Sequence, residues 1–220
     1  LTEADVAVDD ALRSCLPGDG EGWLSEETRD DRSRLQSDRV WIVDPVDGTR
    51  EFVMGIPEWC VSVGLTVGGR AVAGGVLSPA TGDRIVGSVD DGVLHNGRPV
   101  SCTGATDLRG ALVLASRSEV KRGEWAGFFK EPISVRNMGS VAYRLALVAA
   151  GLADATWTLV PKNEWDVAAG AALVTAAGGD VFGLDFGPVP FNEPDPLKPG
   201  FVATAAGISA ATKRLLTHHL

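Results

Sequence analysis

Apolar and polar residues alternate along residues 61–67, a pattern typical of a strand with one buried face. Residues 68–69 are two glycines that predict a tight turn, and residues 71–77 supply the returning strand. Further turn signals at residues 90–92 and 96–97 continue the pattern. The first half of the chain is therefore expected to form a meander of short, largely antiparallel strands.

The first residues predict an amphipathic helix. Thr2 and Asp5 have the spacing of a capping box, with Thr2 as the N-cap and Asp5 at the third helical position. Apolar residues then recur at helical spacing until Pro17-Gly18 ends the helix. Because the chain begins at Leu1 rather than at Met, we expect a further N-terminal segment to precede it.

Charged residues dominate residues 28–39, which predict a solvated loop. A short apolar strand follows at residues 40–43 and is expected to end abruptly at Asp44-Pro45. This strand therefore carries the first of several acidic residues toward a loop.

From about residue 111, strands alternate with helices. The expected strands span residues 111–115, 133–135, 155–159, 181–184 and 201–204, and the expected helices span residues 140–150, 165–177 and 209–218. Such alternation indicates a layered α/β unit. A Ser/Thr/Gly/Asp stretch at residues 101–110 predicts a boundary between an α+β subdomain, residues 1–105, and an α/β subdomain, residues 106–220.

The composition narrows the classes of function. With 20 basic and 29 acidic side chains, the formal charge is −9, which argues against binding to polymeric nucleic acid or an anionic membrane. A small anionic substrate stays possible, because a bound cation reverses the local field. No apolar run approaches the roughly 18 residues of a membrane span. The three cysteines form no CxxC pair, which favours a reducing cytoplasm.

The segment with the clearest chemistry is Asp44-Pro45-Val46-Asp47-Gly48-Thr49. Pro45 makes the turn rigid, and such a turn can direct both carboxylates and an intervening carbonyl to one side. These are hard oxygen ligands of the kind that Mg²⁺ accepts. The residues after Asp47 are expected to open a helix whose free N–H groups would bind a phosphate. The alternative is a charged turn with an Asp N-cap.

The spacing of the acids in this segment does not match two other acidic motifs. Phosphatases of the haloacid dehalogenase type carry D-x-D-G-T, in which acids two apart share one face of a strand. The spacing here is D-x-x-D-G-T. An EF-hand loop needs acids at its first, third and fifth positions, and these are absent.

Two further acids are candidate ligands. Glu26 follows a strand candidate at Trp23-Leu24, about twenty residues before Asp44, although an exposed Glu pair is the alternative. Asp166 lies in the first turn of a predicted helix, where the helix dipole alone favours an acid.

Together, Ser25-Glu26-Glu27, residues 44–49 and residues 165–170 resemble, in this order, the signatures of the inositol monophosphatase-like superfamily of Mg²⁺-dependent, lithium-sensitive phosphatases. The resemblance covers nearly the whole chain, from residues 2–5 to residues 192–203. It implies a layered αβαβα fold and a homodimer. It also implies an upstream helical segment that packs on the core and can close over the site.

Within the superfamily, the chain is most similar to the CysQ-type 3′(2′),5′-bisphosphate nucleotidases, through Glu51-Phe52 and residues 191–195 and 200–203. Tyr143 departs from that pattern, because these nucleotidases usually carry Lys there. The expected reaction is hydrolysis of a small phosphorylated metabolite. The substrate favoured over the alternatives is 3′-phosphoadenosine 5′-phosphate. Inositol 1-phosphate and fructose 1,6-bisphosphate are the alternative substrates, and a metal-dependent binding protein without turnover is the alternative class.

The resemblance also assigns the site residue by residue. The metal ligands that it implies for two or three Mg²⁺ ions are Glu26, Asp44, the carbonyl of Val46, Asp47 and Asp166. Mn²⁺ would substitute, and Li⁺ or Ca²⁺ would inhibit. Thr49, hydrogen-bonded to Asp5, would act with Asp47 in activating a water molecule, and the backbone N–H groups of Gly48 and Thr49 would bind the phosphate.

Three basic residues are candidates for contact with a second phosphate or with the body of the substrate, namely Arg117, Arg144 and Lys162. The alternative for each is a solvated surface position. His218 and His219 show no ligand spacing and are expected to lie in a frayed terminus.

Overall fold

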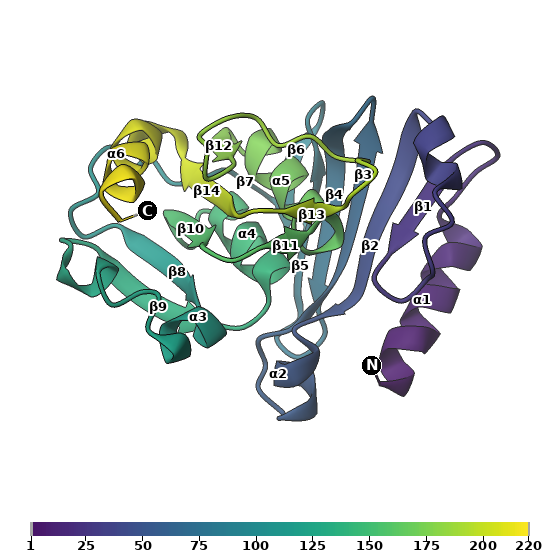
Figure 1. Cartoon of the computed structure of the whole chain (residues 1–220), viewed down its shortest axis with the longest axis horizontal. Helices are drawn as coiled ribbons and strands as arrows, with labels where there is room; N and C mark the ends of the chain where they lie inside the picture. The colour runs from purple at the N-terminus through teal and green to yellow at the C-terminus, as the bar shows by residue number, and fades with distance from the viewer. Residues whose placement is uncertain (1, 220) are drawn as a thin grey trace.

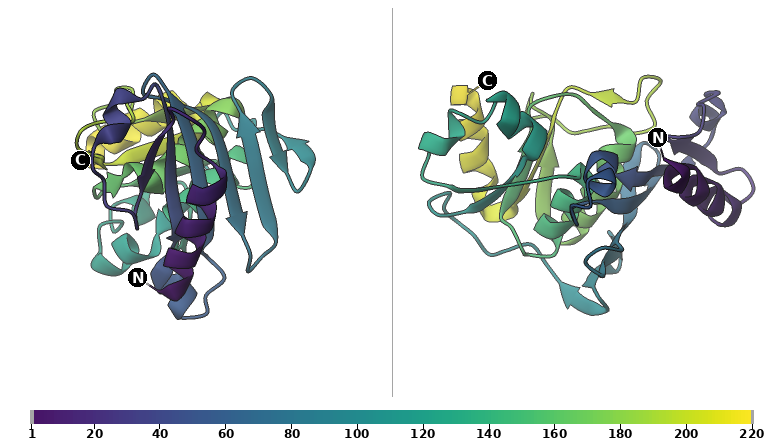
Figure 2. Two further views of the ribbon diagram at one scale, coloured as in Figure 1. Left: turned by 90° about the vertical axis from the view of Figure 1, so that its right-hand side faces the viewer. Right: turned by 90° about the horizontal axis from the view of Figure 1, so that it is seen from below.

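Helices and sheets alternate in layers through the computed structural model, which describes residues 2–219 (Figure 1). The helix α1 (Glu3–Cys15) lies on one side of the first sheet, and α4 (Val141–Ala149) and α5 (Glu164–Ala176) lie between the two sheets. Beyond the second sheet lies α6 (Ser209–His219). The views in Figure 2 agree on this order. The layered αβαβα arrangement confirms the expected fold class.

The first sheet has seven strands in chain order. They are β1 (Gly22–Ser25), β2 (Arg39–Asp47), β3 (Cys60–Val67), β4 (Arg70–Ser78), β5 (Asp83–Ser88), β6 (Gly92–His95) and β7 (Arg98–Val100). Only the β1–β2 pair is parallel, and the other neighbours pair antiparallel. The predicted meander is confirmed.

The second sheet has five strands in the order β12, β14, β10, β8, β9. Their bounds are Gly179–Phe182, Phe201–Ala205, Ala155–Thr158, Leu112–Ser116 and Ser134–Met138, and each overlaps its predicted range. A two-stranded sheet joins β11 (Lys162–Asn163) to β13 (Leu197–Lys198). The division of the chain near residue 105 lies between β7 and β8 and stays a prediction. Within residues 2–219, no helix combines the length and the apolar character needed to cross a bilayer.

Small residues allow α5 to lie very close to the first sheet. A Cβ atom on Gly64 would lie 2.8 Å from the backbone nitrogen of Ala169, and one on Gly74 would lie 2.4 Å from its carbonyl oxygen. On the opposite face, a Cβ atom on Gly170 would lie 2.3 Å from the Cβ of Leu145 on α4. A larger side chain at Gly64 or Gly74 would push α5 away from the sheet, and one at Gly170 would push it away from α4; either would displace the acidic first turn of α5.

The prediction of a solvated loop at residues 28–39 is wrong in one respect. This segment contains a 3₁₀ turn, Ser33–Gln36, and its Arg34 side chain is only 1% exposed. Arg34 Nη2 forms an ion pair with Asp30 at 2.9 Å, and Arg34 Nη1 donates to Asn192 Oδ1 at 2.7 Å. The guanidinium is buried because these partners replace its water.

The end of the strand β2 and the C-terminal end of the helix α6 also differ from what the sequence predicts. The strand β2 does not end at Asp44-Pro45 but continues to Asp47, with an irregular register in between. Pro45 is tolerated there because it lies where the ladder is already interrupted. His219 is not frayed, since it belongs to α6 and its Nε2 lies 2.9 Å from Glu131 Oε1.

Candidate metal centre

Three carboxylates meet where β2 ends and α5 begins. Asp44 and Asp47 come from β2, and Asp166 comes from the first turn of α5. One carboxylate oxygen from each residue lies within 4.8 Å of the others. We call these three residues the acidic cluster. The structure therefore brings together the three Asp residues that the resemblance assigned to a metal.

A β-bulge directs Asp44 and Asp47 to the same side of the sheet. Asp44 pairs with Ser62 and Asp47 pairs with Cys60, so three steps along β2 match two steps along β3. In a regular strand, residues three apart point to opposite faces, and the extra residue reverses the second one. The D-x-x-D spacing thus suits a bulged strand as well as a turn. Within the bulge, the backbone N–H of Val46 donates to Asp44 Oδ1 at 3.0 Å.

The start of α4 holds Asp47. Its Oδ2 accepts hydrogen bonds from Ser140 Oγ at 2.7 Å and from the backbone nitrogen of Ala142 at 2.5 Å. Ser140 has φ of 45° and ψ of 115°, a left-handed backbone that costs about 1–3 kcal/mol for a residue other than glycine. Its hydroxyl also accepts from Tyr143 N at 3.0 Å and so caps α4. Sequence reasoning missed Ser140, although its place at the start of the helix predicted over residues 140–150 marks it as an N-cap candidate.

Asp166 and Glu26 approach from two other elements. Asp166 Oδ2 accepts from the backbone nitrogen of Asn163 at 2.9 Å and completes a capping box with it. Glu26 follows β1, and its backbone N–H donates to the carbonyl of Val43 at 3.3 Å, which places it beside Asp44. Its carboxyl group interacts with that of Asp44 and is partly desolvated, although the residue as a whole is exposed and does not belong to the acidic cluster.

Thr49 joins the acidic end of β2 to α1. It begins the short helix α2 (Thr49–Val53), as expected after Asp47. Thr49 Oγ1 lies 3.0 Å from the carbonyl oxygen of Val46 and 3.5 Å from Oδ1 of the buried Asp5. The other oxygen of Asp5 accepts from Thr2 Oγ1 at 2.6 Å, so the capping box and the contact with Thr49 coexist.

Gly48 makes the sharp change of direction between β2 and α2. Its φ is 92°, a value that L-residues rarely adopt. A Cβ atom there would also lie 3.1 Å from the carbonyl oxygen of Glu58. Glycine is thus required for the turn that brings Thr49 back toward Asp5.

Burial leaves the acidic cluster electrostatically unfavourable without a cation. Burial, followed by the charge of Asp47, raises the pKa of Asp44 well above its usual range. The same two causes raise the pKa of Asp166 to about 7. Burial also raises the pKa of Asp47, against the hydrogen bonds from Ser140 and Ala142, and it raises the pKa of Glu26. A divalent cation would offset this repulsion.

The donor set fits a hard divalent cation. Among residues 2–219, protein donors bind only Oδ1 of Asp44, only Oδ2 of Asp47 and only Oδ2 of Asp166. Each Asp therefore keeps one oxygen available, and all the available ligands are oxygens, as Mg²⁺, Mn²⁺ and Ca²⁺ prefer.

The three basic candidates lie in different environments. Arg117 forms an ion pair with Glu58, and its Nε lies 3.8 Å from Glu51 Oε1. Arg144 is only 1% exposed and its Nε donates to Ser140 O at 3.3 Å. The expectation of contact with substrate and the alternative of a solvated surface position are therefore both wrong for Arg144. Lys162 is half-buried on β11, directly before α5.

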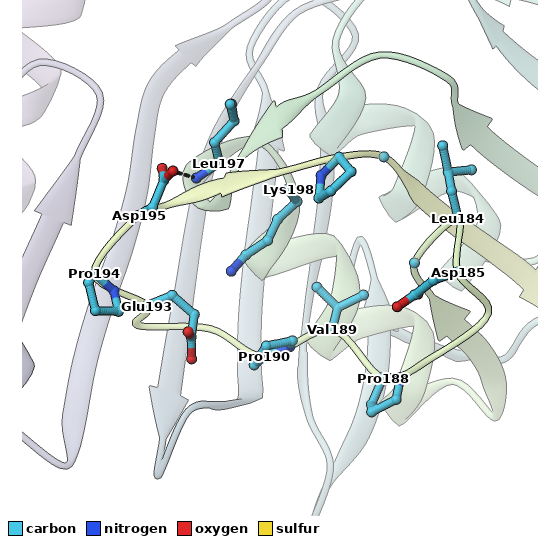
Figure 3. Close-up of a pocket in the computed structure, with 13 residues that line it drawn as sticks. Leu184, Asp185, Pro188, Val189, Pro190, Glu193, Pro194, Asp195, Leu197 and Lys198 are labelled. Atoms are coloured by element: carbon cyan, nitrogen blue, oxygen red, sulfur yellow. Dashed lines mark hydrogen bonds between the residues drawn. The ribbon is translucent and has the colours of Figure 1, made fainter.

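A cavity of about 510 Å³ lies elsewhere, inside the loop that joins β12 to β14 (Figure 3). Proline and aliphatic side chains line most of it, with the acids Asp185, Glu193 and Asp195. Its lysine, Lys198, is paired with Glu164 at 2.8 Å. Because the lining offers acids and a neutralised cation, this cavity does not suit a phosphate, and the chemistry points to the acidic cluster instead.

The alternating layers and the acidic cluster define the class as a layered α/β protein with a candidate site for a divalent cation. The sequence profile of the inositol monophosphatase family matches residues 1–219, and the chain belongs to this family. Members of the family are metal-dependent phosphomonoesterases, and the chain is therefore an enzyme of this type.

Individual relatives agree on the family and differ in substrate. A 3′-phosphoadenosine 5′-phosphate phosphatase of Mycobacterium leprae is 37% identical over 210 residues, which cover 90% of this chain and 73% of that protein. An inositol-1-monophosphatase of Mesorhizobium japonicum is 35% identical over 196 residues, 85% of this chain and 73% of that protein. Relatives with two different named activities are thus similar to this chain at nearly equal identity.

Solved structures support the fold. The inositol monophosphatase of Anabaena superimposes with a TM-score of 0.83 at 27% identity, covering 99% of this chain and 87% of that one. That of Thermotoga maritima superimposes with a TM-score of 0.85 at 25% identity, covering 100% of this chain and 84% of that one.

Proposed function

We propose that this chain is a Mg²⁺-dependent phosphomonoesterase that hydrolyses 3′-phosphoadenosine 5′-phosphate. The observation that carries the proposal is the acidic cluster, whose three carboxylates each keep one oxygen without a donor from residues 2–219. The choice of substrate is supported by the Mycobacterium leprae relative. Inositol 1-phosphate and fructose 1,6-bisphosphate are the alternatives, and the inositol monophosphatase relatives support the first of them.

The ligands proposed for two or three Mg²⁺ ions are Glu26, Asp44, the carbonyl of Val46, Asp47 and Asp166. Glu26 directly follows β1, and the other proposed ligands lie on β2 and α5, so the proposed site combines distant parts of the chain. When bound, Mg²⁺ lowers the pKa of a water molecule and stabilises the charge of the leaving oxygen. The protein contributes the position of each ligand and the surrounding hydrogen bonds.

Thr49 and Asp5 are proposed to handle the proton of the attacking water. The Thr49 hydroxyl has one hydrogen and two nearby acceptors, the carbonyl oxygen of Val46 and Asp5 Oδ1. When that hydrogen points to Asp5, the lone pairs of Thr49 Oγ1 can accept a hydrogen bond from water. The backbone N–H groups of Gly48 and Thr49 are proposed to bind the phosphate oxygens.

The test is release of inorganic phosphate from the three substrates, with and without Mg²⁺, by the unaltered protein and by Asp47→Asn. Asn is close to Asp in shape and can still accept hydrogen bonds from Ser140 and Ala142, but it carries no charge. We expect Asp47→Asn to abolish Mg²⁺-dependent release while far-UV circular dichroism stays unchanged. Unchanged turnover would contradict the assignment of Asp47.

Two additions sharpen the experiment. Inhibition by lithium at millimolar order is expected from the family resemblance, and insensitivity would indicate a different site. A protein that binds Mg²⁺ in calorimetric titration but releases no phosphate from any substrate would be a metal-dependent binding protein instead.

A further inference from the structure

Glu58 is a carboxylate outside the acidic cluster that contacts the loop before α4. It lies between α2 and β3, and its side chain is only 15% exposed. Its Oε2 accepts a hydrogen bond from the backbone nitrogen of Gly139 at 2.9 Å. Gly139 immediately precedes Ser140, whose hydroxyl donates to Asp47 Oδ2 at 2.7 Å. Two hydrogen bonds and one short stretch of backbone therefore connect Glu58 to Asp47.

The loop before α4 needs such a support. The φ of 45° at Ser140 is unfavourable for a residue with a side chain and persists only where surrounding contacts hold it. Both groups that donate to Asp47 Oδ2, the Ser140 hydroxyl and the Ala142 backbone nitrogen, belong to this turn. The bond from Gly139 to Glu58 fixes the peptide unit directly before the strained residue.

Arg117 fixes the direction of the Glu58 side chain. It is the first residue of α3 (Arg117–Arg122), which follows β8 of the second sheet, and its Nη2 donates to the same Oε2 of Glu58. One carboxylate oxygen thus receives two donors from two different elements. Glu51 packs against the same loop, because a Cβ atom on Gly139 would lie 2.5 Å from the Cδ of Glu51.

We infer that Glu58 is a positioning residue for the metal ligand Asp47. By accepting from Gly139, it holds Ser140 and Ala142 where their donors orient the Asp47 carboxylate toward the acidic cluster. Glu58 is not itself a ligand, and its effect on metal affinity passes through the loop before α4. This inference rests on the metal site of the proposed function and names a residue that supports it. Groups that orient a ligand commonly change metal affinity by about 10- to 100-fold.

Calorimetric titration with Mg²⁺ tests this with two variants of Glu58. Glu58→Met keeps the approximate length of the side chain but removes the acceptor, and should weaken Mg²⁺ binding about tenfold. Glu58→Gln removes the same charge, but its carbonyl oxygen can still accept from both Gly139 and Arg117. It should stay within about threefold of the unaltered protein. Equal losses for the two variants would show that charge is responsible and would overturn the inference.

A double variant tests whether Glu58 acts through Ser140. Ser140→Ala removes the hydroxyl that the loop presents to Asp47. In that background, Glu58→Met should weaken Mg²⁺ binding by less than about threefold further, because the contact that it supports is already lost. If the two losses instead multiply to about 100-fold, Glu58 acts independently of Ser140 and the inference is wrong.

Glu21 offers a matched control at a distance from the acidic cluster. Its carboxylate also accepts from a glycine, with Gly18 N at 2.9 Å from Oε2, and also pairs with an arginine, with Arg39 Nε at 2.6 Å from Oε1. Glu21 precedes β1, whereas Glu26 follows it. Glu21→Met should leave Mg²⁺ affinity unchanged. A loss equal to that of Glu58→Met would attribute both to general destabilisation and would contradict a specific role.

Hydrogen exchange in EDTA, followed by NMR, keeps this inference distinct from the proposed function. In the metal-free protein, the Ala142 amide, which donates to Asp47, should exchange about tenfold faster in Glu58→Met and at an unchanged rate in Glu58→Gln. If the unaltered protein binds no Mg²⁺, the proposed function fails, and faster exchange in Glu58→Met still supports the positioning role. If exchange at Ala142 is the same in all three proteins, the positioning role fails whatever the Mg²⁺ titration shows.

Discussion

Replacing Asp166 by Asn should stabilise the metal-free protein at pH 8 and change it little at pH 4. Burial, and then the charge of Asp47, raises the pKa of Asp166 from 3.8 to about 7. Asn has nearly the same shape, and its side-chain oxygen can still accept from the backbone nitrogen of Asn163. The substitution therefore removes the unfavourable charge and keeps the capping interaction.

The sign and size of the effect follow from proton linkage. Between pH 3.8 and about 7, the folded protein keeps a proton on Asp166 that the unfolded chain has released, so stability falls as pH rises through this range. The interval is about 3 pH units, and each unit corresponds to about 1.36 kcal/mol, which gives about 4 kcal/mol above pH 7. Because Asp47 carries part of the repulsion, the single substitution should recover about 2–4 kcal/mol.

Urea denaturation in the presence of EDTA measures this gain. The unaltered protein, Asp166→Asn and the exposed control Asp90→Asn are compared at pH 4 and pH 8. With Mg²⁺ at about 1,000 times its Kd at pH 8 the order should reverse, because the ligand then stabilises the unaltered protein by about 4.1 kcal/mol, which exceeds the gain from the substitution. The substitution removes a proposed ligand and should lose that stabilisation.

Two outcomes would refute this reasoning. A metal-free Asp166→Asn protein that is no more stable than the unaltered one at pH 8 would show that the carboxylate is adequately solvated. A gain of equal size at both pH values would show that it comes from packing rather than from charge. The Asp90→Asn control identifies any general effect of reducing the negative charge.

Two further substitutions test the supports of the site. Ser140→Ala removes the hydroxyl that holds Asp47 and caps α4, and should weaken Mg²⁺ affinity about tenfold and destabilise by about 1 kcal/mol, measured by calorimetry and urea denaturation. Unchanged affinity would exclude a positioning role. Glu164→Gln leaves the buried ammonium of Lys198 without its counter-charge and should cost about 3–5 kcal/mol in the same denaturation assay. A cost below about 1 kcal/mol would mean that water reaches Lys198.

Local patterns predicted those parts of the fold that local interactions determine. The capping box of Thr2 and Asp5 involves residues three apart, and the strand at residues 61–67 is defined by its own alternation. The acids Asp44 and Asp47 were also expected on one side, although the structure achieves this with a bulge rather than with a turn.

Partners distant in sequence account for what could not be predicted. Ser140 and Asp47 are separated by 93 residues, and Arg34 and Asn192 by 158. Nothing near Arg34 in the sequence distinguishes it from the exposed arginines around it. Its burial depends on a loop that folds back from the far end of the chain, and no periodicity reports such a contact.

The pattern of hydrogen bonds distinguishes the acidic cluster from three other buried acids. In Asp9, Glu119 and Glu164, protein donors occupy both carboxylate oxygens: Asp9 accepts from Ser25 and Thr28, for example, each at 2.5 Å. These acids hold the structure together and have no oxygen to offer a metal.

In the acidic cluster, by contrast, the described donors occupy a single oxygen of each carboxylate. Those donors fix the direction of the side chain, and one oxygen of each carboxylate lies within 4.8 Å of an oxygen of the other two. Burying acids in this arrangement is unfavourable for folding, so it is best explained by a cation that the folded protein binds. The formal charge of −9 therefore includes carboxylates that stabilise the fold and carboxylates that can bind a cation. Only the carboxylates that bind a cation allow an acidic chain to bind phosphate.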